Sequence, residues 1–107
     1  MSGKPSKPKG RSFGQRHYFG RYNQPPLLNE TGRTDPNGNI VRYALVYIDF
    51  DICQEDNGRV LGYDNAHGFH ERHFMGKAEK ADFASYAELA EYFLAEVKRL
   101  RLEHGKG

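Results

Sequence analysis

A run of histidines, carboxylates and an arginine is the part of this 107-residue chain best suited to chemistry. Histidine is the side chain whose ordinary pKa lies closest to neutrality, so a cluster of histidines can both accept and donate protons. Cleavage of RNA needs such a set, because the 2′-hydroxyl must lose a proton, the leaving oxygen must gain one and the phosphorane must be neutralised. The candidate catalytic residues are therefore Asp64, His67, His70, Arg72 and His73.

The same segment has two other interpretations. His67, His70 and His73 recur at every third residue, and together with Asp64 they would supply enough ligands for zinc. That spacing suits a helix rather than the strand expected here, and no pair of cysteines supports a zinc site, so we predict no metal or other cofactor. In the other interpretation, the histidines only bond to neighbouring strands while Asp64 and Asn65 shape a turn.

Strand geometry divides these side chains between two faces. If residues 69–75 are extended, His70 and Arg72 share one face, while Glu71 and His73 share the other. The segment begins with an aromatic residue and ends with a methionine, and both have the parity of Glu71 and His73. We therefore expect the Glu71 face to be the more buried and His70 and Arg72 to form the exposed pair.

The candidate residues need a sheet to position them. Residues 40–52 are rich in apolar side chains and predict a long central strand, buried on both faces over its first half. Asn57-Gly58 favours the positive φ of a tight hairpin, so a strand at residues 59–63 should pair antiparallel with the first. A reversal at residues 65–68 leads into a third strand, residues 69–75.

A helix should follow the strands. Ser85 and Glu88 form a capping box, cations fall in the last turns and Gly105 is a natural stop. The apolar residues at helical spacing are Tyr86, Leu89, Ala90, Phe93, Val97 and Leu100. We predict an α+β fold, in which a small antiparallel sheet of three or more strands is covered by one C-terminal helix within a single domain at residues 40–104.

The N-terminal part differs in composition. Residues 1–22 hold six cations and no acidic residue, which predicts a flexible, disordered basic arm, and residues 23–39 form a turn-rich connector. Cations interleaved with aromatic rings can bind nucleic acid by charge and stacking, although the same residues also suit a solubilising tail or an anchor to the domain. The candidate nucleic-acid-binding residues are Lys4, Lys7, Lys9, Arg11, Arg16 and Arg21.

Composition limits the class of protein. A chain of 107 residues can bury one hydrophobic core. Its one cysteine, Cys53, cannot form an internal disulfide, and no apolar run approaches the roughly 20 residues of a membrane span. The N-terminus has no apolar stretch typical of a secretory signal, so we expect a cytoplasmic protein with no membrane partner.

The segment from Val60 to His73 also resembles the TumE-like family of toxins from toxin–antitoxin pairs, over about residues 40–100. Its most specific part is Tyr-Asp-Asn followed by a glycine and a His/Arg-rich run. The resemblance implies a cognate helix-turn-helix antitoxin as partner and RNA as target. It marks Tyr63, Asp64, Asn65, Gly68, His70, Arg72 and His73, of which Tyr63, Asn65 and Gly68 would be structural.

We therefore expect a toxin-like protein that cleaves RNA or another nucleic acid without a metal. His70 and His73 would exchange protons, Arg72 would hold the phosphate, and Asp64 would orient a histidine or the turn. The alternative is a non-catalytic module that binds nucleic acid or a protein through the basic arm.

Overall fold

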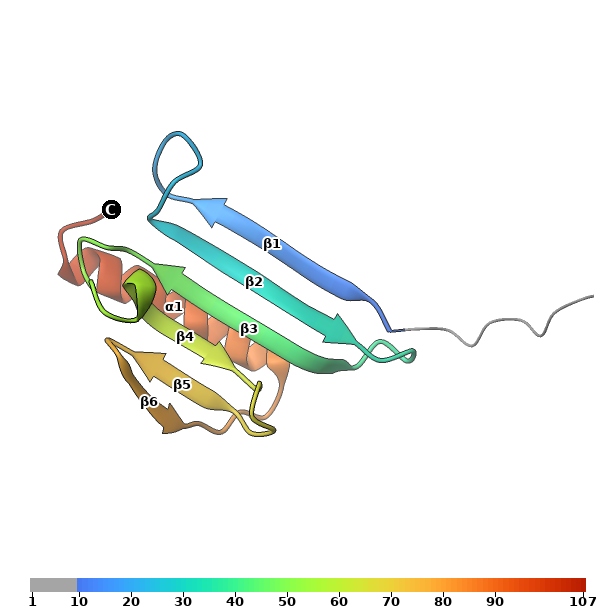
Figure 1. Ribbon diagram of the computed structural model, residues 1–107. Coiled ribbons are helices and arrows are strands. Elements are labelled where there is room, and N and C mark those ends of the chain that lie inside the picture. The colour runs from blue at the N-terminus through green and yellow to red at the C-terminus, as the bar shows by residue number, and fades with distance from the viewer. Residues whose placement is uncertain (1–9) are drawn as a thin grey trace, which may run out of the picture.

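Six strands and one long helix make up residues 10–107, the part of the chain that the computed structural model describes. The strands form one antiparallel sheet in which each strand pairs with the next along the chain, and α1 lies across one face behind β3 and β4 (Figure 1). The elements are β1 Ser12–Tyr18, β2 Leu27–Thr34, β3 Ile40–Ile48, β4 Arg59–Asp64, β5 Glu71–Phe74, β6 Lys77–Lys80 and α1 Tyr86–Glu103. The predicted α+β class, an antiparallel sheet covered by one C-terminal helix, is confirmed.

Strands β1 and β2 lie where the sequence predicted an arm and a connector. They pair in register from Ser12 opposite Arg33 to Tyr18 opposite Leu27, so the expectation of irregular structure is corrected for these residues. Glycines and polar residues give both segments a low intrinsic strand propensity, and β2 depends on the apolar strand β3 for its second set of hydrogen bonds. The expected arm also includes residues that lie outside the described range, namely Lys4, Lys7 and Lys9.

Strand β3 is covered on one face only. Tyr43, Leu45 and Tyr47 are buried beneath α1, whereas the even-numbered residues of the strand are half-buried or exposed on the opposite face. The expected burial on both faces is wrong, because α1 covers a single side of the sheet. The strand also ends at Ile48 rather than at residue 52.

The turns around β3 follow the predicted residues with one change of geometry. The carboxylate of Asp35 accepts the backbone N–H of Asn37 and of Asn39, each at 2.9 Å, and so closes the turn before β3. After β3, Asn57 and Gly58 adopt the expected positive φ, 55° and 82°. They do so in a short 3₁₀ turn of a longer connection, not in a two-residue hairpin, yet β3 and β4 pair antiparallel as predicted.

Helix α1 begins at the predicted cap, since the hydroxyl of Ser85 accepts the N–H of Glu88 at 3.1 Å. Its buried stripe packs on β3 and β4 and consists of Leu89, Phe93, Val97 and Leu100. Within residues 10–107, no helix is both long and apolar enough to cross a membrane. The cytoplasmic location stays a prediction.

A buried carboxylate interrupts that apolar stripe and ties the helix to the sheet. Glu96, whose side chain is 6% exposed, accepts the Tyr63 hydroxyl and lies 2.6 Å from Nη2 of Arg72, and Nε of Arg72 donates to Tyr63 at 3.0 Å. Burial, reinforced by the bond to Glu96, raises the pKa of Tyr63, so its hydroxyl keeps the proton it donates. Burial alone would lower the pKa of Arg72, but Glu96 raises it above its ordinary value and the guanidinium stays charged.

A second buried carboxylate ties the C-terminus to the end of β3. Asp49 is 1% exposed, and its Oδ2 lies 2.8 Å from Nζ of Lys106 and 3.1 Å from the donating Tyr47 hydroxyl. Gly105, with φ of 72°, ends the helix as predicted and turns Lys106 back toward the sheet. Burial would raise the pKa of Asp49, but the bonds from Lys106, the Asp51 amide and Tyr47 together lower it below its usual value.

Arg72→Ala should lower the free energy of unfolding by about 3–5 kcal/mol, because it leaves the Glu96 carboxylate buried without its cation. Urea unfolding followed by circular dichroism measures the loss. Arg21→Ala is the control, since Arg21 is exposed in the loop after β1, far across the sheet from β5 and Arg72, and it should cost less than about 1 kcal/mol. Equal losses in the two variants would contradict the importance of the buried pair.

Asp49→Asn should make the protein less stable at neutral pH but not in acid. The folded-state pKa of Asp49 lies below its ordinary value of 3.8, so the ionised carboxylate stabilises the fold above that value and the stabilisation disappears as the pH falls through the lower, folded-state value. The difference in unfolding free energy between the wild type and the variant should therefore shrink below about pH 4. A difference that stays constant down to pH 2 would refute this assignment.

Candidate active site

The sheet face opposite α1, here called the open face, carries a cluster of three titratable side chains where β4 pairs with β5. Nε2 of His73 lies 2.9 Å from Oδ2 of Asp64 and 3.0 Å from Oε1 of Glu71. The strand register explains the meeting, because Asp64 is directly opposite Glu71, and His73 is two residues further along β5 on the same face. We call Asp64, Glu71 and His73 the open-face cluster.

The hydrogen-bond pattern determines how the His73 ring is protonated. Ionised carboxylates only accept, so Nε2 must carry a hydrogen to bond to Asp64, with the Glu71 carboxylate 3.0 Å away. In the neutral ring, Nδ1 then holds the lone pair. Imidazole held by a carboxylate in this way is the arrangement used to orient a general base and to stabilise it once it is protonated. The side chains of the cluster are 14% to 16% exposed, so they are largely buried but still accessible to solvent.

A second histidine lies on the same side. Nδ1 of His67 is 3.7 Å from Oε1 of Glu71, and the His67 side chain is 71% exposed at the turn between β4 and β5. The two imidazoles on the open face are therefore those of His67 and His73, joined through Glu71.

The other two candidate residues face α1. The Tyr43 hydroxyl lies 2.6 Å from Nδ1 of His70. Burial, with the nearby charge of Asp64, raises the pKa of Tyr43 to about 12, so the hydroxyl donates and Nδ1 of His70 accepts. Arg72 is held by Tyr63 and Glu96.

The predicted division of these side chains between two faces is confirmed. The side chains of Glu71 and His73, 15% and 14% exposed, are also less exposed than that of Arg72 at 23%, as predicted, although α1 lies on the side of Arg72. Glu71 and His73 lie on the open face, and Arg72 points toward the helix. The parity argument relied on Phe69 and Met75, and both lie outside β5, with Met75 in a turn at φ of 50°. Neither residue therefore reports which side of the strand is covered.

The structure also bears on which residues could hold a metal. The three histidines weighed as zinc ligands in the alternative interpretation do not assemble, because His70 faces the helix. The ligand atoms that lie within 4.8 Å of one another are those of Asp64, Glu71 and His73. One nitrogen and two carboxylate oxygens could hold a divalent cation, but Nε2 would have to lose the hydrogen that bonds it to Asp64. The absence of a metal stays a prediction.

The Tyr-Asp-Asn motif has a distinct structural task at each position. Tyr63 points into the core, while Asp64 points to the open face. The Asn65 side chain joins the end of β4 to the start of β3, because its Oδ1 accepts from the Tyr43 amide and its Nδ2 donates to the Val41 carbonyl, each at 3.0 Å. Gly68, at φ of 85°, closes the following turn through its N–H to the Asn65 carbonyl.

The predicted arginines are separated in space. Arg11 and Arg21 are exposed just before β1 and in the loop after it. Arg16 lies on the open face, where Nε donates to Oδ1 of Asn29 at 3.4 Å and Nη1 to the Tyr18 hydroxyl at 3.3 Å.

Sequence reasoning missed further open-face residues that only the strand register reveals. Arg33 pairs with Arg42 and Lys80 pairs with Glu71, so all three cations share the face of the cluster. Nζ of Lys80 lies 5.1 Å from the centre of the Phe69 ring, which is 39% exposed. A hollow of about 500 Å³ adjoins this pair and is lined by Asn65, Gly68, Phe69, His70, Lys80, Ala81 and Asp82.

Comparison with known proteins gives one match. The family model described as Toxin TumE matches residues 27–101, which run from the start of β2 almost to the end of α1 and include the open-face cluster. Searches of curated proteins and of solved structures gave no match. The family named by the model is the one that the Tyr-Asp-Asn segment resembles, and the match covers well over half of the chain. The chain therefore belongs to the TumE toxin family.

Proposed function

We propose that this toxin cleaves RNA by metal-independent acid–base chemistry on the open face of its sheet. Membership of the family supplies the coarser role, the toxin component of a toxin–antitoxin pair with an antitoxin as partner. The observation that carries the proposal is the position of His73, held by Asp64 and Glu71 on a face that α1 leaves uncovered.

The reaction needs one group to accept a proton and another to donate one. Nδ1 of His73 takes the proton of the 2′-hydroxyl, while Asp64 and Glu71 stabilise the resulting imidazolium. The 2′-oxygen attacks the adjacent phosphorus, the bond to the 5′-oxygen breaks, and protonated His67 gives that oxygen its proton. The products are a 2′,3′-cyclic phosphate and a 5′-hydroxyl.

Two roles differ from those expected from the sequence. His67 replaces His70 as the proton donor, because His70 bonds to Tyr43 on the helix side. Lys80 replaces Arg72 as the cation for the phosphate, because Arg72 is already bound to Glu96, whereas Lys80 lies directly opposite Glu71 on the open face.

The open face has the features of a surface for single-stranded RNA. Beside the cluster, Asp64 is opposite the small residue Ala44 of β3, which is opposite Thr31 of β2, and His73 is opposite Gly62, so small residues border the cluster on the open face. Phe69 offers a ring on which a base can stack, and Lys80 lies beside it for the phosphate.

A second candidate is a non-catalytic module that binds nucleic acid. It is supported by the arginines of the open face, Arg16, Arg33 and Arg42, which would bind phosphates without help from any histidine. Deleting residues 1–22 would not test it cleanly, since the deletion removes β1 and exposes the edge of β2. Substitution of single side chains is the better test.

His73→Ala should reduce RNA cleavage at least about 100-fold and abolish growth inhibition, because the general base is removed. Cleavage of labelled RNA by the purified protein gives the rate, and thermal unfolding checks that the variant is folded. His104→Ala is the matched control, since His104 is exposed at the end of α1 and should leave the rate unchanged.

RNA binding by the same variant separates the two candidates. A folded His73→Ala protein that binds RNA but does not cleave it supports the nuclease. A folded variant that inhibits growth as well as the wild type rejects the nuclease, and loss of inhibition in Arg33→Ala/Arg42→Ala would then favour the module.

Phe69→Ala should weaken the binding of a short single-stranded RNA by about 1–3 kcal/mol, the usual range for one stacked base, while Phe69→Trp should retain it. Fluorescence anisotropy with the catalytically silenced His73→Ala background measures binding without cleavage. Tyr92→Ala is the control, because Tyr92 is an exposed aromatic residue on α1. Equal affinities for Phe69→Ala and its parent would show that no base stacks there.

A further inference from the structure

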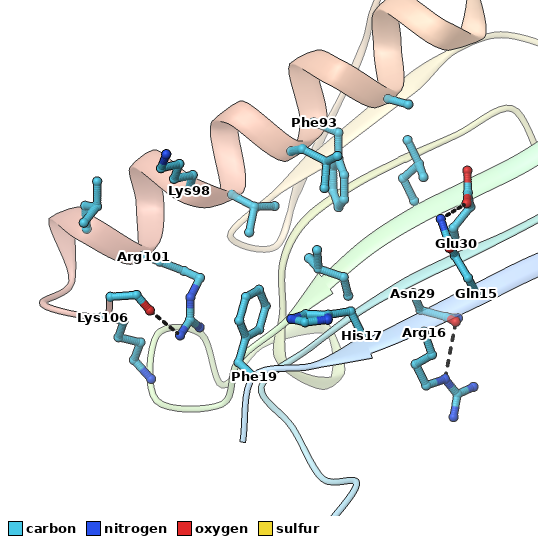
Figure 2. A pocket seen from close by; sticks show the side chains of 17 residues that line it. Gln15, Arg16, His17, Phe19, Asn29, Glu30, Phe93, Lys98, Arg101 and Lys106 are labelled. Atoms are coloured by element: carbon cyan, nitrogen blue, oxygen red, sulfur yellow. Dashed lines mark hydrogen bonds between the residues drawn. The ribbon is translucent and has the colours of Figure 1, made fainter. Parts of the chain in front are cut away.

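A groove of about 620 Å³ runs between α1 and strands β1 and β2 on the helix side of the sheet. Figure 2 shows Phe19 and Arg101 at one end, Phe93 and Lys98 on the helix, and His17 on the strand opposite. The apolar side chains that line it are Phe19, Leu28, Leu45, Ala90, Phe93, Leu94, Val97 and Leu102.

The groove exists because one helix is too narrow for six strands. A helix with its side chains is roughly 10 Å across and neighbouring strands are roughly 4.8 Å apart, so one helix covers about two strands. α1 covers β3 and β4, which leaves the helix side of β1 and β2 without a second helix (Figure 1). The uncovered width is about that of one helix.

The side of α1 that faces the groove is unusually apolar for an exposed surface. Ala90, Leu94, Lys98 and Leu102 follow one another at four-residue spacing and all line the groove. Leu94 is 54% exposed and Leu102 is 62% exposed. Ala90, Leu94 and Leu102 form a second apolar stripe beside the one that packs on β3 and β4, and Lys98 lies within it. An exposed apolar stripe of this kind marks a surface on which a further helix or strand can pack.

The groove is also basic. Lys98, Arg101 and Lys106 contribute cations at the C-terminal end of α1. Arg101 is bound to Tyr47 and Lys106 to Asp49, whereas Lys98 is exposed and has no ion-pair partner among the described residues. Glu30 is the one acidic side chain among the described lining residues, and it already accepts from Tyr86 and from Gln15.

We propose that this groove binds an acidic amphipathic helix of a partner protein, with its apolar face on Leu94 and Leu102 and its carboxylates toward Lys98. In a toxin–antitoxin pair, that partner is the antitoxin. A second copy of this chain fits less well, because the C-terminal half of its own helix exposes Lys98 and Arg99, and cations would then meet cations.

A synthetic helical peptide tests the groove directly. The probe is an 18-residue labelled peptide with leucines on one face and glutamates on the other, titrated with the full chain in an anisotropy assay. The chain should bind this peptide at least about tenfold more tightly than the same peptide with lysines in place of the glutamates.

Variants then locate the binding site. Leu94→Asp should weaken binding at least about tenfold, whereas Tyr92→Asp, an equally exposed position of α1 that does not line the groove, should change it less than about twofold. Lys98→Glu should reverse the preference between the acidic and the basic peptide. His73→Ala should leave the peptide affinity unchanged, so this inference and the nuclease can fail separately.

Three results would overturn the proposal. The first is no preference for the acidic peptide, and the second is equal binding by Leu94→Asp and Tyr92→Asp. The third is a concentration-dependent dimer, seen by light scattering, that becomes monomeric in Leu94→Asp. Such a dimer would assign the groove to a second copy of the chain.

Discussion

The buried contact of Glu96 with Arg72 and Tyr63 is the interaction on which the rest of this structure depends. It decides which side of β4 and β5 meets the helix. Because side chains alternate along a strand, drawing Tyr63 and Arg72 toward α1 sends their neighbours Asp64, Glu71 and His73 to the other side. The contact that holds the helix in place therefore also assembles the open-face cluster.

This contact contributes specificity more than strength. The attraction within a buried ion pair largely offsets the cost of removing both charges from water, so the pair adds little net stability relative to well-packed apolar side chains. A shift of β5 by one residue would, however, move Arg72 to the open face and leave the Glu96 carboxylate buried alone. Buried charge thus disfavours the wrong register in β5, a strand too short and too polar for apolar burial to specify it.

The elements that could be predicted from sequence are those specified by local signals. The cap at Ser85, the turn at Asp35 and the antiparallel pairing across Asn57-Gly58 depend on residues close together in the chain, and all three form. Strands β1 and β2 could not be predicted in this way, because their stability comes from pairing along the sheet. The face on which His73 lies could not be predicted from local signals either. It follows from the direction of its neighbour Arg72, whose partner Glu96 is 24 residues away in the sequence.

One local signal did point to the buried pair. Leu89, Phe93 and Leu100 define the apolar stripe of α1, and Glu96 falls within it. A carboxylate in such a position must find a cation or a hydrogen-bond donor, and β5 holds an arginine, Arg72, beside the histidines. Pairing Glu96 with Arg72 would have predicted that Arg72 points toward the helix and that His73 points away from it.

The two sides of the sheet impose a constraint on how this toxin can be controlled. The open-face cluster and the basic groove lie on opposite faces, so a helix seated in the groove cannot by itself cover His73. An antitoxin that binds in the groove can therefore cover His73 only if another of its segments passes around an edge of the sheet. Otherwise it must inhibit the toxin by holding α1 against β3. The edge beside the cluster is β6, a short strand with a lysine at each end and an alanine and a glutamate between them, and this charged composition discourages pairing with another strand. The opposite edge, β1, borders the groove itself, so a chain leaving the groove would cross β1 before it reached the open face.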